Sequence, residues 1–77
     1  MKKIRNLENY LYNKYRINYA HNNYQEEEML LDTIYKNNVV EWHYDYFVKF
    51  NNITIKLRKI VEENLDTNNY IINIYEI

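Results

Sequence analysis

The chain of 77 residues contains no Cys, Gly, Pro or Ser, and these absences exclude several kinds of chemistry. Without Cys there is neither a disulfide nor a thiolate metal site, and without Ser the commonest acyl-transfer nucleophile is missing. Without Gly there is no phosphate-cradling loop or dinucleotide fingerprint. We therefore predict a non-enzymatic protein that uses no cofactor, folded as one small domain over residues 1–77.

Long hydrophobic runs are absent as well. No segment approaches the roughly 20 apolar residues of a membrane span. The basic start, MKKIRNLENY, lacks the apolar stretch of a signal peptide. We expect a cytoplasmic protein with no membrane partner.

Asn, Tyr and Ile dominate what is present. Asn is the commonest residue and Tyr occurs 10 times, whereas Ala occurs once. Residues with AT-rich codons make up more than half of the chain, which indicates an AT-rich genome such as that of a low-GC bacterium, its phage or its plasmid. The net charge is only −1. Positive charge gathers in residues 1–20 and negative charge in residues 21–47, so that neither sign dominates the whole molecule.

The clearest structural pattern runs from Val39 to Phe50. Apolar and aromatic residues alternate there with polar ones, which is typical of a strand with one buried face. Asn51-Asn52 follows, and alternation resumes over residues 53–58. A two-residue turn at this Asn pair predicts a hairpin whose apolar residues match across the strands, with Asp45 opposite Arg58 on the other face.

The N-terminal third has helical spacing. Residues 2–20 carry an apolar stripe at three- and four-residue intervals, and we predict a helix there. Residues 24–37 repeat the pattern, with Asn23 as N-cap and Glu26 three residues later, so a second helix is predicted.

The C-terminal segments complete the predicted fold. Residues 57–65 fit either a continuing strand or a short helix, while residues 70–77 are rich in β-branched and aromatic types and predict a final strand. Four Asn-Asn pairs mark the expected boundaries, since Asn adopts the left-handed conformation most readily when Gly is absent. The predicted class is α+β, with two N-terminal helices packed on a three-stranded antiparallel meander.

Three groups of side chains are candidate binding residues. The acidic group could contact a protein partner by imitating phosphate charge, and consists of Glu26, Glu27, Glu28 and Asp32. Exposed tyrosines offer rigid contact area with a polar tip, and this group consists of Tyr10, Tyr12 and Tyr24. The basic group could contact phosphates of a nucleic acid, and consists of Lys2, Lys3, Arg5 and Arg16.

One further trio could hold a metal ion. Glu41, His43 and Asp45 project from one face of the predicted strand, with about 6.5–7 Å between successive Cβ atoms. We interpret them instead as a solvent-facing polar surface with an Asp45–Arg58 pair, and predict no metal site.

The favoured function is a protein-binding module. In size and composition the chain resembles small proteins encoded by phages and plasmids of AT-rich hosts, among them anti-CRISPR proteins. That resemblance implies an inhibitor of a host defence nuclease or of a regulator, acting in the cytoplasm of a bacterial host. A small nucleic-acid-binding regulator that uses the basic N-terminal helix is the alternative. A homodimer formed through an exposed sheet edge is also expected.

Overall fold

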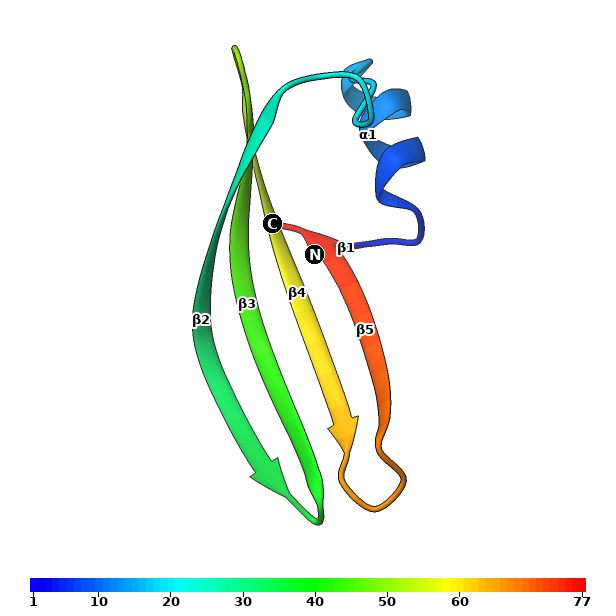
Figure 1. Ribbon diagram of the computed structural model, residues 1–77, viewed down its shortest axis with the longest axis vertical. Helices are drawn as coiled ribbons and strands as arrows, with labels where there is room; N and C mark the ends of the chain where they lie inside the picture. Colours follow the sequence, from blue (N-terminus) through cyan, green and yellow to red (C-terminus); the bar gives the residue numbers. More distant parts are fainter.

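A single antiparallel sheet makes up most of the molecule. The computed structural model describes residues 1–77 and has an elongated shape of 43 × 21 × 20 Å. Five strands and one helix follow in the order β1 (Lys2–Ile4), α1 (Leu7–Tyr15), β2 (Tyr24–Lys36), β3 (Val39–Phe50), β4 (Thr54–Asn64) and β5 (Asn69–Glu76). The strands lie side by side as β1-β5-β4-β3-β2, so that β1 and β2 form the two edges (Figure 1).

The predicted fold class, two helices on a three-stranded meander, is wrong. Residues 24–37 form strand β2 rather than a second helix, and the helix predicted over residues 2–20 is limited to Leu7–Tyr15 with strand β1 before it. The ambiguous residues 57–65 fall within or just after β4, so they continue the strand. The final strand at residues 70–77 is confirmed as β5.

The error in β2 has an identifiable cause at Asn37-Asn38. Both residues have positive φ, 50° and 61°, and they connect Lys36 to its cross-strand partner Val39. Two successive left-handed residues make the tight turn whose twist suits a hairpin. Long-range pairing with β3 thus overrides the helical spacing of residues 24–37, which belongs to a strand with an irregularity in the pairing register between Leu30 and Asp32.

The predicted hairpin between β3 and β4 is confirmed in its register. Val48 pairs with Ile55, Tyr46 with Leu57, and the buried Asp45 with Arg58. Asn51 and Asn52 lie at the turn but both keep negative φ, and the Phe50 amide donates to the Ile53 carbonyl at 2.9 Å. Apolar matching across the strands, rather than left-handed Asn residues, therefore fixes this register.

Helix α1 begins and ends with local hydrogen bonds. The Asn6 side chain accepts from the Asn9 amide at 3.0 Å, which caps the N-terminus. Arg16 takes the left-handed conformation with φ 58°, and its amide donates to the Tyr12 carbonyl at 2.9 Å. The chain then crosses the top of the sheet and enters β2 at the opposite edge (Figure 1).

The hydrophobic core lies under α1, at one end of one sheet face. Its buried residues come from the helix and three strands, β1, β3 and β4: Ile4, Leu11, Tyr46, Val48, Ile55 and Leu57. We call this half the covered end. Only 8 of 77 residues are buried, so the rest of the sheet has no second layer. The half that carries the β2–β3 turn and the β4–β5 loop is here named the bare end (Figure 1).

Candidate functional site

The acidic residues predicted on a helix lie instead along the open edge of the sheet. Strand β2 pairs only with β3, so its other side offers unpaired backbone groups. All of its 13 residues are exposed except Thr33, which is half-buried. Because side chains alternate along a strand, Glu26 and Glu28 project on the face that carries α1, while Glu27 projects on the opposite face. The acidic side chains thus flank the edge from both sides.

Each glutamate has a partner within the chain. The Tyr19 hydroxyl donates to Glu26 at 2.6 Å. Lys49 Nζ lies 3.0 Å from Glu27, and Lys59 Nζ lies 3.6 Å from Glu28. Exposed pairs of this kind contribute about 0–1 kcal/mol. A partner with a positive charge could therefore displace these contacts at little cost.

Two tyrosines beside these glutamates have raised pKa values. Burial, together with Glu26 and Glu28, raises the pKa of the Tyr46 hydroxyl to about 12. The pKa of Tyr19 is raised too, by burial and then by its hydrogen bond to Glu26. In both cases burial is the larger cause, and the nearby carboxylates add to it because they oppose a tyrosinate.

The three candidate tyrosines do not form one patch. Tyr10 packs partly buried against the core, with its ring 6.5 Å from Tyr15 in an edge-to-face arrangement. Tyr12 is exposed on α1 beneath the Arg16 guanidinium, whereas Tyr24 stacks on Tyr19 at the start of β2 with 4.5 Å between ring centroids. Of the three, only Tyr24 lies on the acidic edge strand.

The basic residues are separated as well. Lys2 and Lys3 lie on β1 and point to opposite faces of the sheet, and Lys2 Nζ lies 5.8 Å from the Tyr10 ring centroid. Arg5 precedes the helix and Arg16 caps its other end. They do not make the continuous basic stripe expected of a long N-terminal helix, and a role in nucleic-acid binding stays a prediction.

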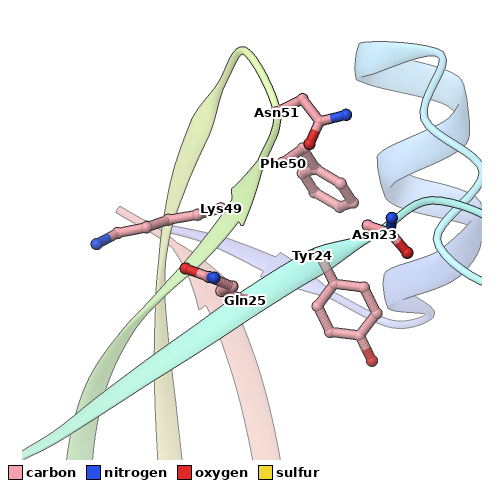
Figure 2. A pocket seen from close by; sticks show the side chains of 6 residues that line it. All are labelled: Asn23, Tyr24, Gln25, Lys49, Phe50 and Asn51. Carbon is pink, nitrogen blue, oxygen red and sulfur yellow. The ribbon is translucent and has the colours of Figure 1, made fainter.

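The largest surface hollow lies where β2 and β3 meet the helix end. It has a volume of about 450 Å³ and is lined by Asn23, Tyr24, Gln25, Lys49, Phe50 and Asn51. Figure 2 shows the Tyr24 and Phe50 rings toward the helix and Lys49 extending to the other side of the strand. No carboxylate or imidazole lines it, and its one ionisable amine is paired with Glu27.

The sheet face opposite α1 carries Glu41, His43 and Asp45, the three residues examined in the sequence as possible metal ligands. Arg58 Nε donates to Asp45 Oδ1 at 2.6 Å and its Nη2 to Oδ2 at 3.2 Å, so the predicted Asp45–Arg58 pair is confirmed. Asp45 is buried, not solvent-facing as expected, and its hydrogen bond to Arg58 holds its pKa below the usual value. His43 Nε2 lies 3.2 Å from Glu41 but makes no hydrogen bond. No group of three His, Asp or Glu residues is close enough to ligate a metal ion.

The carboxylate of Glu76 joins helix α1 to the sheet. Glu76 at the end of β5 accepts from Lys14, and from the Tyr15 hydroxyl at 2.5 Å. Burial raises the pKa of Glu76, but the hydrogen bonds from Lys14, Tyr10 and Tyr15 outweigh it and leave that pKa below its usual value. Sequence reasoning missed this cluster, because residues 62 positions apart meet only through the β1–β5–β4 pairing.

Comparison with known proteins identifies no family for this chain. No protein-family model, curated protein or solved structure matches the chain. No helix has the length and apolar character needed to cross a membrane.

Proposed function

We propose that the protein is a non-enzymatic binding module that captures an extended, basic segment of another protein along the open edge of β2. The observation that carries the proposal is a 13-residue edge strand with an unoccupied backbone ladder and exposed glutamates on both sides. An added strand gains main-chain hydrogen bonds, and charge on alternate side chains supplies selectivity.

The chemistry of the edge determines the kind of partner. Lys or Arg residues on an added strand point alternately to the two sheet faces, where they meet Glu28 on one side and Glu27 on the other. RNA-guided nucleases hold their nucleic acid in a positively charged channel, which offers the charge that this edge would bind. A host defence nuclease, or a regulator with a similar basic groove, is therefore the proposed target, as in anti-CRISPR inhibition, and the cytoplasm of a bacterial host is the proposed place of action.

A protective role for the same residues makes a different prediction. Charged side chains and β-bulges on an edge strand also prevent sheets from joining edge to edge. β2 has both features, with three successive glutamates and the register irregularity between Leu30 and Asp32. If the glutamates served protection only, their replacement would cause aggregation without affecting capture of a basic partner.

A charge-reversed double variant, Glu27→Lys with Glu28→Lys, tests the proposal. Binding is measured by calorimetry against a synthetic extended peptide with alternating Lys residues, and by NMR shifts of the β2 amides. We expect affinity to fall at least tenfold, because two attractive charges become repulsive. The matched control, Glu8→Lys with Glu62→Lys, changes net charge equally at exposed positions outside β2. Equal affinity of both double variants, or amide shifts confined to other strands, would disprove edge capture.

A further inference from the structure

The bare end carries an apolar surface on the same sheet face as α1. Register places on this face residues from each of the four long strands: Leu30 and Tyr35 of β2, Trp42 and Tyr44 of β3, Val61 of β4, and Tyr70 and Ile72 of β5. We call these seven residues the bare apolar face. Tyr35 is 76% exposed, Tyr70 61% and Ile72 57%. No helix or second sheet lies over this part of the sheet (Figure 1).

From this surface we infer that the protein forms a two-fold symmetric homodimer in which two bare apolar faces pack against each other as a sheet-on-sheet sandwich. The dimer would use the face of the sheet, whereas the proposed capture uses the edge of β2. Sheets stacked in this way lie about 10 Å apart, with their strands aligned to within about 30°.

The charged residues on β4 are placed so that opposite charges meet in a two-fold symmetric dimer. Lys59, Val61 and Glu63 follow one another on the bare apolar face side of the strand, since alternate residues share a face. Consider a two-fold axis that lies midway between the two sheets and runs perpendicular to the strands at the level of Val61. This axis stacks each strand on the same strand of the second copy, which runs in the opposite direction. It places Val61 opposite Val61 and Lys59 opposite Glu63 of the second copy, twice per dimer. The patch is thus apolar at its centre and complementary to itself at its two charged positions.

The helix limits the arrangement to one position along the strands. Val61 pairs with Trp42 across β3 and β4, so the same axis places Trp42 over Trp42 and Tyr44 over Val40 of the second copy. Tyr46, the first β3 residue buried under α1, falls opposite Asn38 in the turn of the second copy. The Asn37-Asn38 turn of each copy would therefore lie next to the part of the other sheet that α1 covers. The two helices would lie at opposite ends of the sandwich.

The area available indicates a reversible dimer. Four strands about 4.8 Å apart and a bare length of about seven residues give a flat footprint of roughly 400 Å². The largest apolar patch on a typical monomer covers about 300–600 Å² and is often functional, whereas a standard interface buries about 800 Å² per partner. The net charge of −1 per chain provides little repulsion between copies. An interface below the standard size is expected to be weak and reversible, so the dimer should dissociate on dilution.

The opposite face fits a second copy less well. It also exposes apolar side chains, among them Met29 and Ile71, but its centre is occupied by Asp45 with Arg58 at 2.6 Å and Lys56 at 3.8 Å. Charged residues are depleted from the centres of protein interfaces because their desolvation is costly.

Sedimentation and intrinsic fluorescence of the intact chain test the dimer. The single Trp lies at the proposed axis, so dilution from about 500 to about 1 μM should shift its emission to longer wavelength as the dimer dissociates. Ile72→Glu should raise the dissociation constant at least tenfold. Ile71→Glu is the matched control, because Ile71 is its neighbour on β5, is 58% exposed and faces the other way. A monomer at every concentration, or a dimer broken only by Ile71→Glu, overturns the inference.

A charge exchange distinguishes a second copy from another protein on the same face. Lys59→Glu alone and Glu63→Lys alone should each weaken the dimer, and the double variant should restore it, because the symmetry pairs these two positions. Two separately weakened variants that stay weak when combined would exclude the proposed axis. Circular dichroism at the working temperature confirms that each variant is folded, and Tyr35→Glu replaces Ile72→Glu if that variant is not.

Discussion

The covered end and the bare end of the sheet are built from the same four long strands but stabilised in different ways. At the covered end, α1 and the following crossover bury Tyr46, Val48, Ile55 and Leu57 from the two central strands. At the bare end, Trp42 and Val61 on the same face are only half-buried, and Val40 is the one buried side chain on that face. The comparison shows that strand pairing continues well beyond the core, and that folding stability and binding surface are separated along the length of the strands.

The two ends are also closed differently. The Asn51-Asn52 turn lies at the covered end, near Ile17 and Phe50. At the bare end the two connections are tied to each other, because the Leu65 amide donates to the Asn38 carbonyl at 2.8 Å and the Asn38 side-chain amide donates to Asp66 at 3.2 Å. These bonds hold the tips of the β2–β3 and β4–β5 hairpins together where no helix covers them.

The largest expected effect tests whether stability resides at the covered end. Leu11 of α1 is 0% exposed, and Leu11→Ala should lower the free energy of unfolding by about 2–5 kcal/mol. Ile71→Ala, at an exposed position of the bare end, should change it by less than about 1 kcal/mol. Urea denaturation followed by circular dichroism measures both, at a concentration low enough to keep the protein monomeric. Equal losses would show that the two ends contribute alike.

Glu76 offers a second test, directed at the attachment of the helix. Glu76→Gln removes the charge that accepts from Lys14 and the Tyr15 hydroxyl, so stability should fall by about 1.5–3 kcal/mol. Glu62→Gln, on the exposed face of β4, is the control and should cost less than about 0.5 kcal/mol. Hydrogen exchange of the α1 amides should accelerate in the first variant only. Acceleration spread evenly over the sheet would contradict a local role.

Lowering the pH should reduce the free energy of unfolding, as the Glu76→Gln substitution does. The pKa values of Glu76 and Asp45 are both lower in the folded chain than in the unfolded one. The unfolded state therefore binds protons first, so their stabilisation is complete above the unfolded pKa, about 4, and declines as pH falls through the folded values. Thermal unfolding between about pH 6 and pH 2 should show this decline. Asp45→Asn should flatten the curve, and an unchanged curve would remove Asp45 from the explanation.

Sequence reasoning succeeded where a local pattern and its tertiary partner agree. Alternation in β3, resumed after Asn51-Asn52, determined both the register with β4 and the Asp45–Arg58 pair, because a shift by one residue would have exposed the apolar face. The same argument marked residues 70–77 as a strand, which β5 confirms.

It failed where local and long-range preferences conflict. Residues 24–37 satisfy helical spacing, and β2 carries apolar residues on both faces, so period-2 alternation was obscured around its register irregularity. The missed signal was Asn37-Asn38, since two consecutive left-handed residues indicate a hairpin more strongly than a helix end. Because residues 24–36 form β2, the acidic candidates Glu26, Glu27 and Glu28 lie at a sheet edge and not on a helix surface. The Glu76 cluster had no local signal, as it depends on β1 pairing with the far end of the chain.

The smallest expected effect compares the two Asn-Asn turns. Asn37 has positive φ, where a β-branched side chain is strained, so Asn37→Val should cost about 1–2 kcal/mol. Asn51 has negative φ, and Asn51→Val should cost less than about 0.5 kcal/mol. The difference, measured by thermal unfolding, should therefore be larger at the bare end although no core residue is touched there. Equal costs would mean that the Asn37-Asn38 conformation contributes little, and that β2 is held in place by its pairing with β3 alone.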